Sequence, residues 1–92
     1  MVVAAQFKES DAQQVTRNKI TCSTKFVFGK RMLEAIGTED INQKYSITLY
    51  DFEQKRGVVT IDCEQCPTLL QQYSPEVLLA ACEDYTYCYR IK

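Results

Sequence analysis

The most reactive side chains belong to a Cys-x-x-Cys motif, Cys63-Glu64-Gln65-Cys66. The motif lies between an expected strand and an expected helix, where a helix N-terminus would lower the pKa of a thiol and favour thiol-disulfide chemistry. Glu64 acts in the opposite direction, because a neighbouring carboxylate raises the pKa of a thiol. We therefore prefer partly buried free thiols that pack as small apolar groups over a redox motif.

Zinc binding would need a second pair of thiolates besides Cys63 and Cys66. The candidate second pair is Cys82 and Cys88, whose separation by five residues does not fit a zinc motif. Cys88 also lies in an expected strand over 85–91. The alternation of side chains along that strand explains its position without a metal. We therefore expect no metal and no cofactor.

The 92 residues include no histidine. This absence excludes Cys-His and Ser-His-Asp enzymes and removes the commonest metal ligand. Asp62 and Glu64 could share one face of a strand, but one acidic pair among twelve acidic residues is weak support for acid–base catalysis. We expect a protein that is not an enzyme.

The basic residues suggest contact with RNA phosphates. Residues 13–33 contain five basic residues and no acid, and an expected turn adds two more, although the net charge of −1 is low for a domain that binds nucleic acid alone. An ordinary solvated surface is the alternative. The candidate phosphate contacts are Arg17, Lys19, Lys25, Lys30, Arg31, Lys55 and Arg56.

Aromatic residues favour a protein interface over stacked bases. Base stacking on a sheet needs exposed aromatic rings on the central strands, and the stretch from Gly57 to Cys63 has none. Phe26 and Phe28 fit a core equally well. The alternating tyrosines near the end of the sequence predict an interface or core packing; they are Tyr85, Tyr87 and Tyr89.

Periodicity predicts the elements that position these residues. Alternation predicts strands over 19–28, 45–52, 58–63 and 85–91. The turn at 53–57 would use Gly57 for a positive φ. Helices are expected over 11–18 and over 30–36 with Gly37 as terminator. Residues 67–83 are expected to form either two short helices, the second starting at Ser74-Pro75-Glu76, or one helix that bends at Pro75. Which hairpin face is buried stays open.

The order strand, helix, hairpin, helix, strand predicts an α+β, ferredoxin-like β-α-β-β-α-β plait with an extra N-terminal segment. Residues 1–92 form one expected domain. The longest apolar run, Val77 to Cys82, is too short to span a bilayer. The first residues lack the features of a secretion signal, so we expect an intracellular protein.

The stretch from Tyr45 to Lys92 is similar in pattern to the small protein subunits of ribonuclease P and ribonuclease MRP. The similarity lies in Ile47–Asp51, in Gly57–Cys63 and in the apolar positions of 69–82; residues 4–8 also look like the start of a helix in that family. The resemblance implies a noncatalytic nuclear subunit that binds another protein subunit and touches RNA.

Two alternatives stay open beside this RNA-processing ribonucleoprotein. The first is an adaptor or inhibitor that offers its tyrosine-rich edge strand for β-strand addition to a partner, without RNA contact. The second is a small thiol or zinc protein that uses the motif at residues 63–66.

Overall fold

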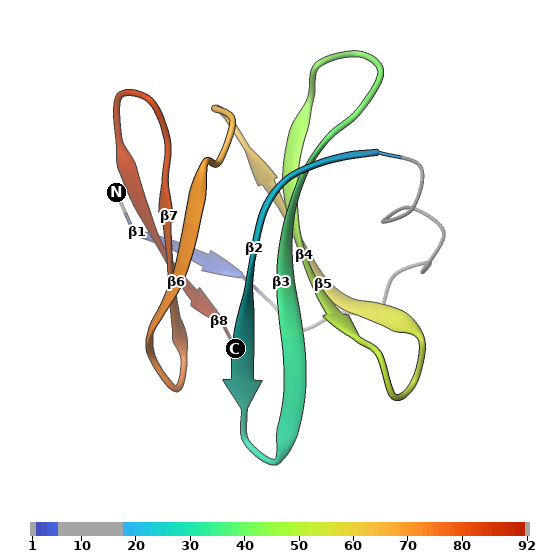
Figure 1. Ribbon diagram of the computed structural model, residues 1–92. Helices are drawn as coiled ribbons and strands as arrows, with labels where there is room; N and C mark the ends of the chain where they lie inside the picture. The colour runs from blue at the N-terminus through green and yellow to red at the C-terminus, as the bar shows by residue number, and fades with distance from the viewer. Residues whose placement is uncertain (1, 6–17, 92) are drawn as a thin grey trace.

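The computed structural model describes residues 2–5 and 18–91 of the chain. They form eight strands in two sheets that pack face to face (Figure 1). No helix occurs among these residues, so the predicted ferredoxin-like α+β plait is wrong and the fold is all-β. The strands are β1 (Val2–Ala5), β2 (Lys19–Phe28), β3 (Arg31–Glu39), β4 (Tyr45–Asp51), β5 (Arg56–Cys63), β6 (Leu69–Ser74), β7 (Val77–Ala81) and β8 (Thr86–Ile91).

One sheet is an antiparallel meander in the order β2-β3-β4-β5, here called the β2–β5 sheet. The other has the order β1-β8-β7-β6 and is called the β6–β8 sheet. Within it, β6, β7 and β8 are antiparallel, while β1 pairs with β8 in parallel, from Val2 beside Cys88 to Ala5 beside Ile91. Sequential strands are thus neighbours everywhere except at β1 and at the crossover from β5 to β6.

Three predicted strand regions are confirmed. The alternating stretch 19–28 is β2 and ends at Gly29, which has a φ of +63° in the turn to β3. The hairpin of residues 45–63 is formed by β4 and β5, and the stretch near the end of the chain is β8. The predicted role of Gly57 is wrong, because Gly57 is buried in β5 and Lys55 takes the positive φ of 56°.

The helix predicted over 30–36 is instead strand β3, between β2 and β4. Met32, Leu33 and Ile36 have helical spacing, but Leu33 and Ile36 lie on opposite faces of β3 and are both buried. Met, Leu, Glu and Ala favour helices only weakly, and strand pairing on both sides overrides that preference.

The helix predicted over 67–83 is instead the hairpin of β6 and β7. Ser74 pairs with Val77, so Pro75 and Glu76 form a tight turn and not a helix start. Proline is equally suited to the second position of a β-turn, where its fixed φ is also needed. The early helical reading of residues 4–8 is wrong at Ala4 and Ala5, which belong to β1. The helix predicted over 11–18 falls, except for Asn18, outside the described residues.

The core lies between the two sheets. Alternate side chains of every strand from β2 to β8 point inward, which settles the buried face of the hairpin as that of Ile47 and Leu49. Both sheets contribute to it, and its members include Phe26, Leu33, Ile47, Leu49, Val58, Val59, Ile61, Leu70, Leu78, Tyr87, Tyr89 and Ile91.

Gln72 of β6 joins the two sheets along one side, where β6 runs beside β2. Its amide nitrogen donates to the carbonyl oxygen of Val27 at 2.8 Å, and its amide oxygen accepts the N–H of Val27 at 2.9 Å. The side chain therefore satisfies both backbone groups of one residue of β2, as a neighbouring strand would.

An ion pair joins the start of β3 to the end of β4 in the β2–β5 sheet. Arg31 Nη2 lies 2.8 Å from Asp51 Oδ2, and Asp51 Oδ1 accepts the backbone N–H groups of Glu53 and Gln54 at 2.9 and 3.2 Å. The Asp51 carboxylate is buried and receives donors on both oxygens, so it holds the turn that follows β4.

Asp51 is expected to make stability depend on acid pH. The hydrogen bond from Arg31 holds the pKa of Asp51 below its ordinary value, with the N–H groups of the turn acting in the same direction. A lowered pKa stabilises the fold above the ordinary carboxyl pKa, and this stabilisation is lost as the pH falls through the lowered value. Asp51→Asn should therefore be less stable than the parent at pH 7, and the difference should shrink in acid.

Urea denaturation of both proteins from pH 7 down to about pH 2 measures this effect, since that range spans the carboxyl pKa values. Glu83→Gln is the matched control, because Glu83 is an exposed acid at the far turn between β7 and β8. Equal pH profiles for Asp51→Asn and the parent would show that Asp51 does not stabilise the turn.

Candidate functional site

Only three of the four cysteines named for a zinc site are neighbours. Cys63 and Cys82 pack against the core, where each of Cys63 and Cys66 interacts electrostatically with Cys82, whereas Cys88 lines a hollow on the outer face of β8. Among residues 2–5 and 18–91, no group of three or more Cys, His, Asp or Glu side chains is arranged to hold a metal ion. The described residues therefore give the zinc alternative no support.

Burial makes the thiol of Cys63 a poor nucleophile. It raises the pKa of Cys63 to about 11, and the Tyr89 hydroxyl donates to the sulfur at 3.7 Å. Thiolate is the reactive form, and Cys63 is a neutral thiol at pH 7. No helix follows Cys66, whose thiol donates to the Pro67 carbonyl at 3.8 Å. The arrangement fits packing better than redox chemistry.

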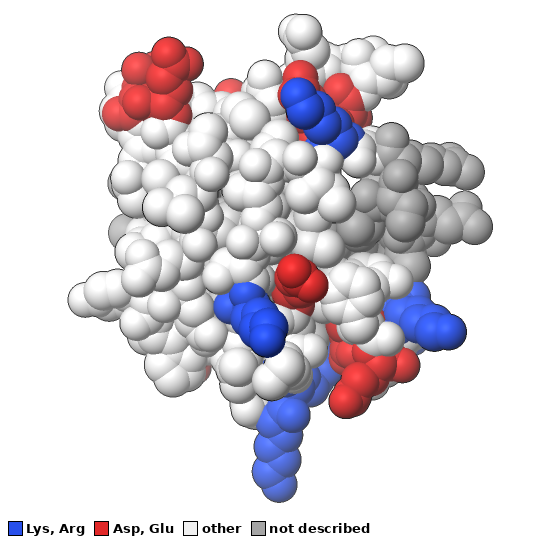
Figure 2. Space-filling model, in the orientation of Figure 1, with Lys and Arg blue, Asp and Glu red and all other residues white. Residues whose placement is uncertain are grey.

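Four of the predicted phosphate contacts lie at one end of the β2–β5 sheet. Lys30 and Arg31 come from the β2–β3 turn, and Lys55 and Arg56 from the β4–β5 turn. Acidic residues share this end: Asp51 pairs with Arg31, and Glu53 lies in the second turn. Figure 2 shows positive and negative side chains mixed in the lower part of the view. This end is therefore not a single positive patch.

The other predicted phosphate contacts are dispersed. Lys25 is paired in register with Glu34, and Lys19 lies at the opposite end of β2, in register with Glu39. Arg17 lies outside the described residues. The basic run in the sequence thus becomes a set of separated charges with acidic neighbours.

The three tyrosines do not form one interface, and of the two predicted alternatives core packing holds for Tyr87 and Tyr89. Tyr87 and Tyr89 are buried, with ring centroids 6.1 Å apart, and only Tyr85 is exposed. Their strand, β8, lies between β1 and β7 and is not an edge. It has no free side for adding a partner strand, so that route of partner binding is also overturned.

Exposed apolar residues occur on both sheets: Met32 and Phe52 line a hollow on the β2–β5 sheet, and a second area is the outer face of the β6–β8 sheet. Leu69 and Tyr73 of β6 are 61% and 73% exposed. By register, Leu79 lies between Gln71 and Cys88 on this face, and Ala81 lies beside Leu69. In Figure 2 the surface over β6 and β7 is almost free of charge, apart from an acidic group at the upper left. We call this face the outer β6–β8 surface: Leu69, Gln71, Val77, Leu79, Ala81 and Cys88, with Tyr73 at its margin. At Tyr73 a β-bulge interrupts the alternation of β6, and the residue lines a hollow on the β2 side.

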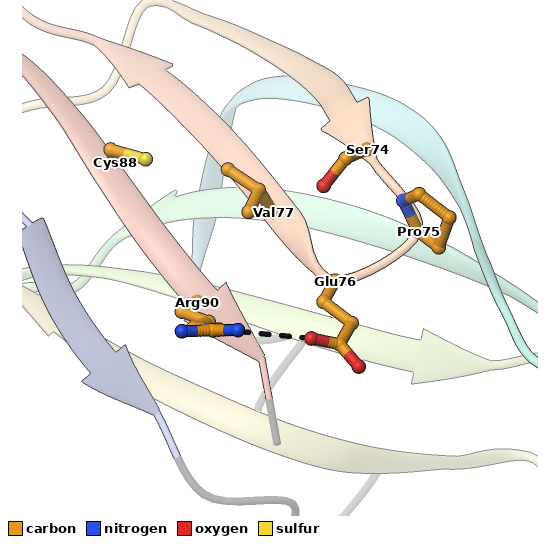
Figure 3. Close-up of a pocket in the computed structure, with 6 residues that line it drawn as sticks. All are labelled: Ser74, Pro75, Glu76, Val77, Cys88 and Arg90. Atoms are coloured by element: carbon orange, nitrogen blue, oxygen red, sulfur yellow. Dashed lines mark ion pairs between the residues drawn. The ribbon is translucent and has the colours of Figure 1, made fainter.

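Two hollows flank the Pro75 turn at the edge of this surface. One, of about 450 Å³, is lined by Val77 and Cys88 and bounded by the ion pair of Glu76 with Arg90, whose charged groups are 3.7 Å apart (Figure 3). The other, of about 490 Å³, lies on the β2 side of the turn, where Tyr73 lines it. The surface is therefore uneven, with an apolar middle and a polar margin, as protein interfaces commonly are.

Comparison with models of known protein families, with curated proteins and with solved structures found no match. No helix among the described residues is long and apolar enough to cross a membrane.

The sequence reasoning missed the outer β6–β8 surface because it assigned these residues to a helix. The pattern that could have shown it is the alternation of Leu69, Gln71 and Tyr73, followed by the apolar run that begins at Val77. A short apolar run bounded by turn residues fits a strand as well as a helix.

Proposed function

We propose that this chain is a noncatalytic protein-binding module and that a partner protein packs against its outer β6–β8 surface. The observation that carries the proposal is the exposure of Leu69 on this face and of Tyr73 at its margin, where Glu76 and Arg90 are the charged residues beside Val77. Contiguous exposed apolar patches on soluble proteins often mark interaction sites.

Tyr73 and Leu69 are the expected anchors. Tyrosine contributes a large contact area with few rotatable bonds, and interface anchors of this type give most of the binding energy. The Glu76–Arg90 pair lies at the rim, where an exposed ion pair contributes little affinity and helps to orient the partner.

Charge favours a protein partner over RNA. Most basic residues of the β2–β5 sheet have acidic neighbours, and the chain carries a net charge of −1. Non-specific RNA affinity depends on uncompensated positive charge. The proposal therefore keeps the predicted role of binding another protein subunit, while the RNA-processing assembly stays a prediction.

A photo-cross-linking amino acid at position 73 tests the proposal in the cells that make the protein. We expect a discrete adduct at position 73 and none with the same amino acid at position 52, since Phe52 is 58% exposed on the other sheet. The adduct mass distinguishes a second copy of this chain from a different protein.

Leu69→Glu, made in the protein that carries the cross-linking amino acid at position 73, should reduce the yield of the adduct at least about tenfold. A buried unpaired charge at an interface is costly. Glu83→Gln should leave the yield unchanged. Equal adducts at positions 73 and 52, or an adduct unaffected by Leu69→Glu, would overturn the proposal.

A further inference from the structure

Part-exposed thiols gather around the segment of residues 64–68 that connects β5 to β6, here called the crossover; they are Cys22, Cys63, Cys66 and Cys82. Cys22 of β2 donates its S–H to the carbonyl oxygen of Pro67 at 3.2 Å. Cys82, which follows β7, donates to the carbonyl oxygen of Gln65 at 3.9 Å. Cys22 therefore takes the place near Cys82 that the zinc alternative gave to Cys88.

Cys22 and Cys66 meet at a single atom, the carbonyl oxygen of Pro67. The Cys22 sulfur lies 3.2 Å from this oxygen, and the Cys66 sulfur lies 3.8 Å from it. The two thiols also interact electrostatically, because the neighbouring Cys66 adds to the effect of burial in raising the pKa of Cys22. A disulfide needs the sulfurs about 2 Å apart. Cys66 lies outside the strands, so strand pairing does not prevent it from making the remaining approach.

The Cys22 sulfur is held in place, and the crossover is held against it. Cys22 lies beside Gly37 in the register of β2 and β3. A Cβ atom at position 37 would lie 2.8 Å from the Cys22 sulfur and 2.9 Å from the Pro67 ring, so these two groups occupy the space that a side chain would take. Pro67 is fully buried, which anchors the crossover over β2 and β3. Cys66, the residue before Pro67, is thereby presented to Cys22.

The other thiols have different contacts. The Tyr89 hydroxyl donates to the Cys63 sulfur at 3.7 Å, and burial raises the pKa of Cys63 to about 11. Thiolate is the form that attacks a disulfide, so Cys63 reacts slowly at pH 7. Cys88 lies apart, in the hollow on the outer face of β8. The geometry therefore favours a pair outside the Cys-x-x-Cys motif, Cys22 with Cys66.

We propose that Cys22 and Cys66 form a reversible disulfide that ties the crossover to β2, with a low-molecular-weight disulfide such as oxidised glutathione as the oxidant. The Cys66 thiolate attacks one sulfur of glutathione disulfide and releases the first glutathione as a thiolate. The Cys22 thiolate then attacks the Cys66 sulfur of the mixed disulfide and releases the second glutathione. The two protein thiols lose two protons and two electrons, which convert one glutathione disulfide into two glutathione thiols.

The bond would close a loop that contains the whole of β3, β4 and β5. A cross-link that closes a long loop restricts the unfolded chain and stabilises the fold. It would also join β2 to the segment that leads into β6. Gln72 of β6 already bonds to Val27 near the other end of β2, so oxidation would hold β2 beside β6 at both ends.

Equilibration of the folded, reduced protein with glutathione buffers of increasing oxidised fraction tests the proposal. Free thiols are blocked by alkylation, and mass spectrometry of the peptides locates the disulfide. We expect one disulfide within a single chain, between Cys22 and Cys66, and alkylation of the remaining cysteines. The urea midpoint should rise by about 1 M or more on oxidation, and dithiothreitol should reverse the rise.

Cys22→Ser and Cys66→Ser should each abolish the disulfide and the rise in urea midpoint. The matched controls are Cys63→Ser, within the motif, and Cys88→Ser, on the outer face of β8, and both should retain the disulfide and the rise. Circular dichroism of each reduced variant reports whether it is folded. Cys66→Ser carries the test if Cys22→Ser does not fold, because Cys66 lies outside the strands.

Three results would overturn the proposal. The first is that no disulfide forms within the chain at any glutathione ratio. The second is a disulfide that joins Cys66 to Cys63 or to Cys82 in place of Cys22. The third is an oxidised protein whose urea midpoint equals that of the reduced protein, since the bond would then not tie the crossover to β2.

Discussion

Phe26→Ala is expected to lower the free energy of unfolding by about 3–5 kcal/mol. The ring is completely buried, lies opposite Leu33 on the neighbouring strand and stacks on Phe28 with ring centroids 6.4 Å apart. Removal of the ring leaves a cavity between the two sheets. Strand pairing holds each sheet in place, so the sheets cannot easily move together to fill the cavity. A domain of this size has a total stability of about 5–15 kcal/mol, so much of the variant could be unfolded at room temperature.

Urea denaturation followed by circular dichroism measures the loss. Phe52→Ala is the control, because Phe52 is exposed and its main aromatic contact is an edge-on approach to Tyr50, with centroids 4.6 Å apart. It should cost about 1 kcal/mol or less. If the two variants lost equal stability, Phe26 would not be a core residue.

Gly37→Ala is expected to destabilise the fold by about 1–3 kcal/mol, although alanine normally suits a strand better than glycine. A Cβ atom at position 37 would lie 2.8 Å from Cys22 Sγ and 2.9 Å from Pro67 Cγ. Thr21 Oγ1 would also lie at 2.9 Å. All three distances are too short, so the side chains of Thr21, Cys22 and Pro67, or the backbone that carries them, would have to shift. The helical interpretation, with Gly37 as a terminator, predicts no such contact.

A double-mutant cycle with Cys22→Ala separates this clash from other effects. Cys22→Ala removes the sulfur nearest to the new methyl group, so the double variant should lose less stability than the two single variants summed. The measurement is again the free energy of unfolding in urea. Additive losses would mean that the added methyl group does not press on Cys22.

The hairpin of β4 and β5 was predictable because its alternation is regular and a charged turn separates its strands. Ile47, Leu49, Val59 and Ile61 share one face, and that face is the core. The sequence left the choice of face open, because Tyr50 and Phe52 alternate with these residues. The β6–β8 sheet determines which hairpin face is buried, and the position of that sheet depends on long-range packing.

Neither predicted helix of the 18–91 region exists, and the reasons are local. Leu33 and Ile36 have helical spacing, but β3 is an inner strand with apolar side chains buried on both faces. The Ser74-Pro75-Glu76 stretch fits a helix start and a tight hairpin turn equally well. Sequence-local patterns cannot separate these cases, since the deciding contacts come from β2, β4 and β8.

The candidate sites were predictable only in part. The row that joins Thr38, Ser46 and Asp62 across β3, β4 and β5 required β3 to be a strand, which the sequence reasoning missed. The outer β6–β8 surface depended on the same error, because Leu69 and Tyr73 were assigned to a helix. Tyr87 and Tyr89 alternate as predicted, but burial decides their role, and alternation does not reveal which face is buried.

The parallel pairing of β1 with β8 bears on the order in which the chain folds. Strands β2 to β5 pair with sequence neighbours through short turns, so their contacts close at low entropic cost. The pairing of β1 with β8 must instead enclose nearly the whole described chain in one loop. Such non-local contacts are slow to form. We therefore expect the β2–β5 meander to assemble before β1 docks on β8.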